Sequence, residues 1–303
     1  MTTFPIKYTE PIYRPPAEAS SLLIPVTIGC SHNRCAFCAM YRTKRFKVRT
    51  SDEINKDLRN AAKYLRERGQ VCRKIFFCDG DALAAPFDLL ASAAQGAQAF
   101  FPKLRRISLY ASARNIMEKS IAELSELAQL KLNLAYAGLE SGSDEILNLV
   151  SKGFSAQDMI TASKKLQAAG WQLSLIVMLG LGGKALSKKH VQASAEVVSA
   201  CAPTFLSFLT TVPVPETPYY ERIEMGETQP LTSRELLEEM HAILEQTTPQ
   251  PGTRIIFRAN HVSNLFPLEG ILPRDTEKLL SILKKWIAAC PAGHYPSLDP
   301  RCL

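Results

Sequence analysis

Several features of other protein classes are missing from this sequence of 303 residues. It has no apolar run of the roughly 18 residues that a membrane-spanning helix needs. Its N-terminus, MTTFPIKYTEPIYRPP, lacks the basic segment and apolar stretch of a secretory signal. It also has no internal repeat and no low-complexity tract. These absences predict a soluble, cytoplasmic protein without a membrane partner.

The sequence also lacks a complete ligand set for structural zinc, although three cysteines lie close together. In a reducing compartment its eight cysteines are expected to be ligands or buried apolar residues and not disulfides. Cys30, Cys35 and Cys38 lie in TIGCSHNRCAFCAMYR, directly after an apolar run. Zinc needs a fourth ligand, usually from a second Cys/His pair, and there is no such pair. Three thiolates suit a four-iron cluster with one open iron; the alternative is that they only pack.

Alternating apolar and amphipathic segments predict the fold. Six times, a short apolar segment precedes one of helical periodicity, which indicates a parallel sheet covered by helices. The expected strands are residues 21–29, 73–78, 105–112, 132–139, 171–179 and 204–212, and the expected helices are 51–69, 85–101, 116–130, 155–169, 187–201 and 232–247. We predict an α/β fold, a partial (β/α)6 TIM-like barrel with a parallel sheet and a short C-terminal α/loop extension. The expected domains are an N-terminal extension (1–20), the barrel (21–250) and a C-terminal extension that covers it (251–303).

A polar or glycine-rich segment follows each predicted strand. In chain order these are the cysteine loop, CDGD, SAR, LESGSD, LGLGG and PVPETP. In parallel α/β folds the loops at the carboxyl ends of the strands carry the chemistry. We therefore expect these segments to meet at one rim of the sheet.

The cysteine loop, with Phe37 just before its last cysteine, resembles the cluster loop of the radical S-adenosylmethionine (SAM) superfamily. GLESGSDEIL followed by SKG resembles the branch that includes the oxygen-independent coproporphyrinogen oxidases and the tRNA methylthiotransferases. The likeness runs from Leu22 to Tyr220. Four residues separate Cys30 from Cys35 where the usual loop has three, and an extra loop residue can be absorbed without a change of ligands. The resemblance implies a single-domain member without extra N- or C-terminal domains.

The resemblance implies an enzyme with two cofactors, a [4Fe–4S] cluster held by the three loop cysteines, and SAM. Such an enzyme cleaves SAM by one-electron reduction to methionine and a 5′-deoxyadenosyl radical, which abstracts hydrogen from a substrate. The substrate is unidentified, and an external reductant such as flavodoxin or ferredoxin is implied. Whether the reaction is an oxidoreductase, lyase or transferase reaction does not follow from the resemblance.

The resemblance also assigns SAM-binding roles. CDGD resembles the Gly-Gly-Glu-type segment, in which Asp79, Gly80 and Asp81 would meet the ammonium group of SAM; a plain Asp–Gly turn is the alternative. Glu140 matches a residue facing the methionyl end, and Lys152 a cation for its carboxylate, unless Lys152 is only a solvated helix-end lysine. The remaining implied contacts are Phe37 beside the cluster, Ser112 at the ribose, and Gly180 and Val212 along the adenine. The GLGG segment around Gly180 is equally consistent with a tight turn.

Three further residues are candidates for substrate chemistry. FRANHVSN (257–264) follows the apolar RIIF and is placed to cover the lateral gap of a six-unit barrel. There Arg258 would pair with a carboxylate or phosphate, and His261 would exchange a proton. Cys78, which ends the second strand, is a candidate hydrogen-atom donor or covalent group. The alternatives are that FRANHVSN is an ordinary surface loop and that Cys78 is a buried packing residue.

A different class of function also stays open from the sequence. The net charge of +7 and the basic stretch RTKRFKVR (42–49) are compatible with a non-catalytic zinc or RNA-binding module, so nucleic acid stays open as a partner. The simpler interpretation of this stretch is a solvated loop anchored by Phe46. A protein that acts on another macromolecule is a third alternative. Colour distinguishes a radical SAM enzyme from a zinc module, because an iron–sulfur protein is brown and a zinc module is colourless.

Overall fold

The computed structural model describes residues 4–296 and contains one large β-sheet. Its eight strands follow one another in the order β1-β4-β5-β6-β7-β8-β9-β10. Each strand pairing whose register is defined in this sheet is parallel, except that β10 is antiparallel to β9. The α/β fold with a parallel sheet that the sequence predicts is therefore confirmed. None of the helices in residues 4–296 is long and apolar enough to cross a membrane.

Short strands alternate with helices along most of the chain. The strands are β1 (Leu22–Pro25), β2 (Thr27–Ile28), β3 (Lys47–Val48), β4 (Lys74–Cys78), β5 (Arg106–Tyr110), β6 (Leu132–Glu140), β7 (Gln172–Leu179), β8 (Phe205–Thr210), β9 (Ile255–Arg258) and β10 (Glu269–Leu272). The α-helices are α1 (Ser51–Arg66), α2 (Phe87–Phe100), α3 (Ala113–Glu118), α4 (Ile121–Gln129), α5 (Asp144–Leu149), α6 (Ala156–Ala168), α7 (Gly183–Cys201), α8 (Pro218–Glu224), α9 (Ser233–Gln246) and α10 (Thr276–Ala289). Two 3₁₀ turns, η1 (Pro16–Glu18) and η2 (Ala82–Ala84), complete the elements.

The chain divides into two compact units that are described separately. The first comprises the residues up to Asn33, Met40–Ala137 and Lys164–Leu173. The second comprises Arg34–Ala39, Gly138–Ser163 and the residues from Ser174 onward. The predicted division into an N-terminal extension, a barrel and a C-terminal extension stays a prediction, and its residues 1–3 and 297–303 lie outside the described part of the chain.

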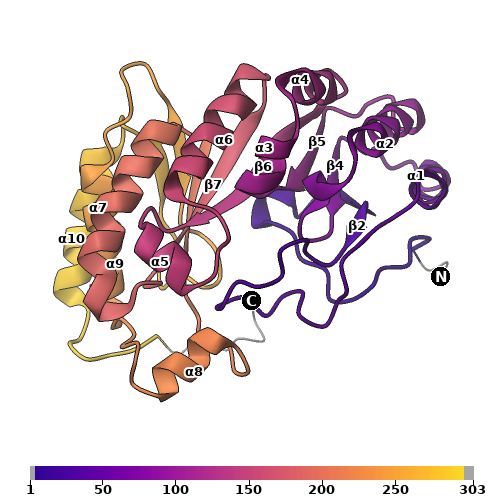
Figure 1. The fold of residues 1–303 in the computed structure, drawn as a ribbon. Helices are drawn as coiled ribbons and strands as arrows, with labels where there is room; N and C mark the ends of the chain where they lie inside the picture. The colour runs from indigo at the N-terminus through magenta and orange to yellow at the C-terminus, as the bar shows by residue number, and fades with distance from the viewer. Residues whose placement is uncertain (1–3, 297–303) are drawn as a thin grey trace. The chain divides into compact units, whose positions relative to one another are not determined.

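In the first unit, local sequence signals account for the helices. The side chain of Thr50 accepts a hydrogen bond from the backbone N–H of Glu53, whose carboxylate accepts one from the N–H of Thr50, and this capping box begins α1. Ile54 and Leu58 are buried on one face of α1, which packs beside α2. The helices α1, α2 and α4 follow one another at the edge of this unit (Figure 1).

The segment before β1 belongs to the core of the first unit. Glu18 in η1 is completely buried. Its Oε1 accepts hydrogen bonds from the hydroxyl of Tyr136, at 2.7 Å, and from the guanidinium of Arg106, at 3.0 Å. Burying a carboxylate is costly unless it is paired, so these two bonds fix the chain that leads into β1.

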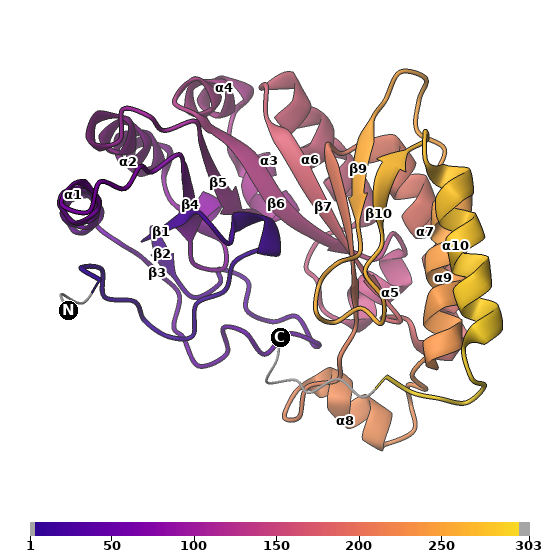
Figure 2. The same ribbon diagram turned by 180° about the vertical axis from the view of Figure 1, so that it is seen from behind.

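In the second unit, α9 lies between α7 and α10, and α10 runs beside β9 and β10 (Figures 1 and 2). One face of the strands packs against these helices. A Cβ on Gly270, which opposes Phe257 in the β-register, would lie 3.1 Å from Leu279 of α10. Side chains alternate between the two faces of a strand, so the register partners Ser207 and Arg258 lie on the opposite, half-buried face.

The sheet continues beyond the six predicted β/α units. The last three residues of the apolar segment RIIF lie in β9, which pairs in parallel with β8, and β10 follows as an antiparallel strand. The sequence predicts a C-terminal α/loop extension because this part of the chain lacks the β/α alternation of the six units. The helix of this C-terminal part is α10, Thr276–Ala289.

Candidate functional site

The three predicted cluster ligands lie in the loop between β2 and β3. Cys30, Cys35 and Cys38 are half-buried and form no disulfide within the described chain. Two backbone bonds fix the middle of the loop: the N–H of Ala36 donates to the carbonyl of Val150 at 2.8 Å, and its carbonyl accepts from Tyr219 at 3.1 Å. The segment that carries Cys35 and Cys38 is therefore held by the ends of α5 and α8.

An apolar cluster in the second unit surrounds this part of the loop. Its buried members are Ala36, Ile146, Val150, Leu181 and Tyr219, and Phe37 packs against them from a half-buried position. The contact of Phe37 with this cluster gives it a packing role. Its predicted place beside a cofactor stays a prediction.

Asp79, which is predicted to face SAM, is hydrogen-bonded to other groups of the protein. Its Oδ2 accepts hydrogen bonds from the backbone N–H of Gly29, at 3.0 Å, and from the ammonium of Lys44, at 2.5 Å. The side chains of Lys44 and Asp79 are 2% and 4% exposed. This buried ion pair fastens the start of the cysteine loop to the end of β4.

Gly80 has no side chain and allows another group to approach its backbone closely, as its residue type predicts. The group that lies there is the side chain of Tyr41. A Cβ at this position would lie 2.5 Å from the ring of Tyr41. The N–H of Gly80 donates to the carbonyl of Gly29 at 3.1 Å. Glycine is therefore required for packing within the first unit.

Asp81 and Ser112 belong to a polar group that connects three segments of the first unit. Oδ2 of Asp81 accepts from the hydroxyl of Ser31, at 2.6 Å, and from the amide of Asn115, at 2.5 Å. Its Oδ1 is buried without a hydrogen-bond partner in residues 4–296. Burial raises the pKa of this carboxyl, against the opposing effect of Ser31 and Asn115. Ser112 caps α3, where its hydroxyl accepts from the N–H of Asn115.

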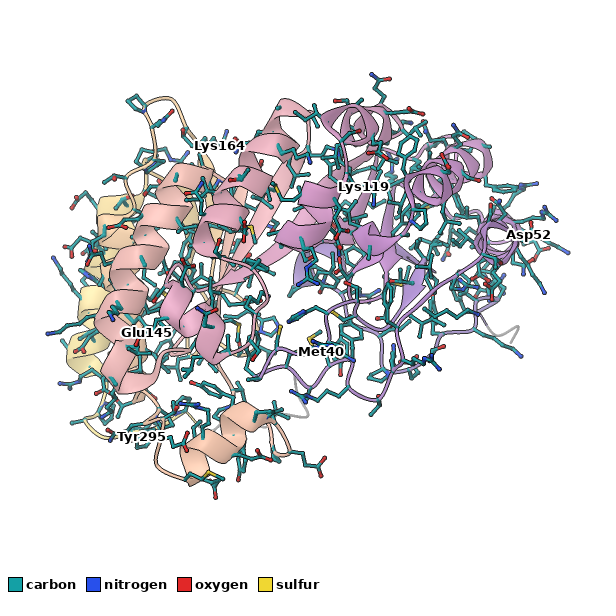
Figure 3. All side chains as sticks on the ribbon, in the orientation of Figure 1. Met40, Asp52, Lys119, Glu145, Lys164 and Tyr295 are labelled. Atoms are coloured by element: carbon teal, nitrogen blue, oxygen red, sulfur yellow. The ribbon has the colours of Figure 1, made fainter. Side chains whose placement is uncertain are left out.

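Glu140 and Lys152 form a nearly buried ion pair in the second unit. Lys152 Nζ lies 2.7 Å from Glu140 Oε1, with side chains 12% and 10% exposed. Burial lowers the pKa of Lys152, but Glu140 and the thiol of Cys35 outweigh burial, so the pKa lies well above its ordinary value. Lys152 is thus no solvated helix-end residue. By contrast, the ion pair of Lys189 with Glu145 lies at the surface, with side chains 66% and 51% exposed. Figure 3 labels Glu145, which belongs to α5.

The backbone around Glu140 is unusual. Glu140 has φ = +63°, in the left-handed region that non-glycine residues seldom adopt. Its side chain folds back over Gly138, where a Cβ would come 2.0 Å from Oε1 of Glu140 and 3.1 Å from Nζ of Lys152. Such backbone positions concentrate at functional sites.

Gly180 and Val212 follow β7 and β8. Gly180 has φ = +79°, which suits a tight turn, and its N–H donates to Oε1 of Glu239 at 2.5 Å. Its carbonyl accepts from the hydroxyl of Tyr219 at 3.2 Å. Val212 is 8% exposed. Both lie after the carboxyl ends of their strands, although the sequence predicts Val212 as the last residue of its strand and β8 ends at Thr210.

The family is decided by residues 24–192, which match the family model of the radical SAM superfamily. This match covers more than half of the 303 residues. The chain belongs to the radical SAM superfamily. Enzymes of this superfamily use a [4Fe–4S] cluster and SAM. No curated protein matches the sequence.

Solved structures of radical SAM proteins share the fold. The archaeal Elp3 of Methanocaldococcus infernus has a TM-score of 0.54 and 15% identity, with 89% of this chain and 63% of that chain covered. Coproporphyrinogen III oxidase (HemN) of Escherichia coli has a TM-score of 0.55 and 16% identity, with coverage of 75% and 52%. The methyltransferase TsrM of Kitasatospora setae has a TM-score of 0.53 and 18% identity, with coverage of 68% and 38%. The chain spans less than two thirds of each of these structures, and identities this low show the fold alone.

The donors of a radical SAM cluster are present in the loop. Three thiols stand within nine residues, and the ammonium of Lys152 interacts with two of them, Cys35 and Cys38. Within residues 4–296, no three His, Cys, Asp or Glu side chains are already gathered around a metal position. The chemistry of the donors fits an iron–sulfur cluster, and the assignment of ligands rests on that chemistry and on the family.

The substrate-side candidates of this radical SAM protein lie in different surroundings. Arg258, the last residue of β9, is half-buried with its guanidinium 5.7 Å from the ring centre of Phe205. His261 Nδ1 lies 2.9 Å from the hydroxyl of Ser263, whose Oγ also accepts from the N–H of Thr210 at the end of β8. The segment after β9 thus lies at the carboxyl end of β8.

Cys78 is completely buried, and burial raises the pKa of its thiol well above the ordinary value. A thiol in this position has no exposure to a substrate. Its role as a hydrogen-atom donor stays an untested prediction, and packing explains its environment.

Sequence reasoning missed two groups of residues. Lys44 lies in the basic stretch that was expected to be solvated, yet it is 6% exposed and paired with Asp79, which weakens the case for a nucleic-acid surface there. Glu239 and His190 are buried polar residues on α9 and α7. No local pattern marks them, because an acidic residue within a helix is usually solvated.

Proposed function

We propose that the protein is a radical SAM enzyme whose cluster is held by Cys30, Cys35 and Cys38. When bound, such a cluster supplies the electron that cleaves SAM reductively to methionine and a 5′-deoxyadenosyl radical, which abstracts hydrogen from the substrate. An external reductant such as flavodoxin or ferredoxin would supply that electron. The residues of this chain bind and orient the methionyl end of SAM.

The observation that carries this proposal is the ion pair of Glu140 and Lys152 beside two of the loop cysteines. Its ammonium group is nearly buried and interacts with the thiols of Cys35 and Cys38. A cation in such a water-poor position attracts a carboxylate strongly. Lys152 would bind the carboxylate of SAM, and Glu140 would orient Lys152 and face the methionyl ammonium group.

The buried carboxylates after β4, in the first unit, are the other candidates for the contact with an ammonium group that the family resemblance implies. Asp81 is the better candidate, because its Oδ1 has no hydrogen-bond partner in the described chain. Asp79 also has one such oxygen, but its charge is already balanced by Lys44. Asp79 therefore positions the loop, and Gly80 serves the same packing. Ser112, Gly180 and Val212 are proposed to border the ribose and adenine, and Phe37 the cluster.

The substrate is proposed to meet the half-buried face of β8 and β9. Arg258 lies on that face beside Ser207, and no carboxylate of the described residues lies within ion-pair distance of it. An arginine in this state is suited to an anionic group of a substrate. His261 would exchange a proton nearby, since burial lowers its pKa and favours the neutral ring.

Anaerobic reconstitution tests the proposal. The wild-type protein is expected to be brown, to bind iron and sulfide, and to release 5′-deoxyadenosine from SAM after reduction. Replacing Cys30, Cys35 or Cys38 by Ala should abolish cluster binding, because two thiolates hold a four-iron cluster poorly. Iron and sulfide analysis and the visible spectrum measure this.

Cysteines outside the loop are the matched controls. Cys72→Ala and Cys290→Ala should retain the iron and sulfide of the wild-type protein. A colourless protein, or full iron in the three loop variants, would overturn the proposal. Adding an anaerobic cell extract and SAM to the reduced enzyme and following the products by mass spectrometry would then identify the substrate.

A further inference from the structure

A buried chain of polar side chains connects α7 and α9 with the loops after β6 and β7. His190 of α7 is completely buried, as are Ser141 and Ser194, and Glu239 of α9 is 2% exposed. His190 Nδ1 lies 2.8 Å from the hydroxyl of Ser141 and 3.3 Å from that of Ser194. On the other side of the ring, Nε2 lies 3.6 Å from Oε1 of Glu239.

The two serine hydroxyl groups beside His190 are also hydrogen-bonded to the backbone of the loop after β6. Ser141 accepts from the N–H of Ser143 at 3.1 Å, and Ser194 accepts from the N–H of Gly142 at 2.9 Å. His190 and these two serines therefore join α7 to that loop. Burial lowers the pKa of His190, an effect that Glu239 opposes, and the neutral ring is favoured.

Glu239 is the end of this chain and the acceptor for the loop after β7. Its Oε1 accepts from the backbone N–H of Gly180, at 2.5 Å, and its Oε2 from the hydroxyl of Ser187, at 2.5 Å. Nε2 of His190 lies 3.6 Å from the same carboxylate, beyond hydrogen-bond distance, and is buried without a hydrogen-bond partner in the described residues. A single buried carboxylate thus fixes the loop after β7 and the start of α7.

The loop after β6 is held equally closely. A Cβ on Gly142 would come 2.1 Å from the carbonyl oxygen of Ala193 in α7, so this loop lies directly on the helix backbone. Ser141 and Gly142 directly follow Glu140. The polar chain therefore ends, on one side, at the residue next to the Glu140–Lys152 pair and, on the other, at Gly180.

A serine, a histidine and a glutamate in contact are also the residue types of an acyl-transfer site. That interpretation is excluded here because all three side chains are buried and a nucleophile must be reached by its substrate. These residues therefore act by holding the loops and helices to which they are hydrogen-bonded.

We infer that His190 and Glu239 are positioning residues for SAM: they hold the loops after β6 and β7 in the arrangement in which Glu140 and Gly180 receive the two ends of the molecule. This inference rests on the proposed function. Each loop is held by its own hydrogen bonds: His190 and Ser194 bind the loop after β6, and Glu239 binds the loop after β7. Loss of either side chain is therefore expected to weaken SAM binding and to leave the cysteine loop unaffected.

Glu239→Gln and Glu239→Leu separate positioning from packing. Gln keeps an oxygen that can accept from Gly180, and Leu removes it. With reconstituted protein, we expect the dissociation constant of SAM to rise about tenfold or more in the Leu variant and less than about threefold in the Gln variant. Iron and sulfide content should equal that of the wild-type protein in both. The change that SAM causes in the electron paramagnetic resonance spectrum of the reduced cluster should weaken in the same order.

His190→Phe and the milder Ser194→Ala provide a second route if the Leu variant does not fold. Ser194→Ala removes one hydroxyl and should raise the dissociation constant by a factor between those of the two Glu239 variants. Glu238→Ala, next to Glu239 on the exposed face of α9, is the matched control and should bind SAM as the wild-type protein does. Wild-type affinity in Glu239→Leu or, failing that, in His190→Phe and Ser194→Ala would overturn the inference. Absence of SAM binding in the wild-type protein itself would instead overturn the proposed function, and the inference with it.

Discussion

At the scale of single residues, Glu140 and Lys152 best illustrate how the fold serves a site. Glu140 adopts a left-handed backbone conformation, and the fold tolerates its cost of about 1 kcal/mol or more. The glycine at position 138 leaves room for its side chain to turn back to Lys152. The two residues are separated by a helix in sequence, and only the tertiary fold gives them their 2.7 Å contact.

Lys152→Met is expected to weaken SAM binding, because it removes the cation proposed for the SAM carboxylate. A hydrogen bond to a charged group contributes about 1.5–3 kcal/mol, which corresponds to roughly ten- to a hundredfold in the dissociation constant. Anaerobic equilibrium binding of SAM to the reconstituted protein measures it. The matched control is Lys189→Met on the exposed pair, which should leave the affinity unchanged. Equal affinities for the Lys152 variant and the wild-type protein would remove Lys152 from the site.

The sequence identifies the types of site residue better than their roles. The three cysteines, Glu140 and Lys152 stand out because of their resemblance to motifs of one superfamily. Asp79 and Gly80 stand out for the same reason, yet the structure shows them engaged with Lys44 and Tyr41. Those partners lie 35 or more residues away in the chain, so local patterns cannot reveal them.

At the scale of elements, the buried pair of Lys44 and Asp79 connects the cysteine loop to β4. Lys44 also donates to the carbonyl of Pro11 at 2.5 Å. Three segments of the first unit therefore meet at one ammonium group. The strength of this connection can be measured directly.

Lys44→Met should lower the free energy of unfolding by about 3–5 kcal/mol, because it leaves the carboxylate of Asp79 buried without its counter-ion. The double variant Lys44→Met/Asp79→Asn should recover part of this loss, since the uncompensated charge is gone. The midpoint of urea unfolding, followed by circular dichroism, measures both. Lys63→Met removes an exposed pair with Glu67 and should have little effect. A Lys44 variant as stable as that control would contradict the buried pairing.

The elements themselves follow closely from the sequence. The apolar runs predict six strands of the sheet, and the helices predicted over 51–69 and 232–247 contain α1 and α9. The sequence does not predict the pairing of β9 and β10, because no β/α alternation continues past the sixth unit to place them in the sheet. Their place is set by pairing with β8, a long-range interaction.

At the scale of the whole molecule, stability should depend on pH through the buried histidine of α7. Burial lowers the pKa of His190 below its ordinary value of 6.5. Above that value the ring is neutral in both the folded and the unfolded chain and makes no difference to stability. Below it, the unfolded chain binds a proton that the buried ring does not, so stability falls as the pH falls.

We therefore expect the free energy of unfolding to decrease between pH 7.5 and pH 5.5, and His190→Asn to reduce this decrease. The largest contribution of one such group is about 1.4 kcal/mol for each pH unit. Urea unfolding at several pH values under anaerobic conditions gives the slope. The comparison concerns the slope and not the absolute stability, which the substitution also lowers. An unchanged slope would show that His190 is protonated equally in both states.

The strand β10 has a consequence for how separate copies of the chain meet. Within residues 4–296 it pairs only with β9, and the N–H and carbonyl of Ile271 on its other side are hydrogen-bonded to Asp275. Long unpaired edges promote intermolecular pairing and aggregation. Here the strand has only four residues, begins at the exposed Glu269 and is followed by Pro273, which has no N–H to donate. The same short, antiparallel strand that is hard to recognise in the sequence thus protects the sheet from growing into a fibre.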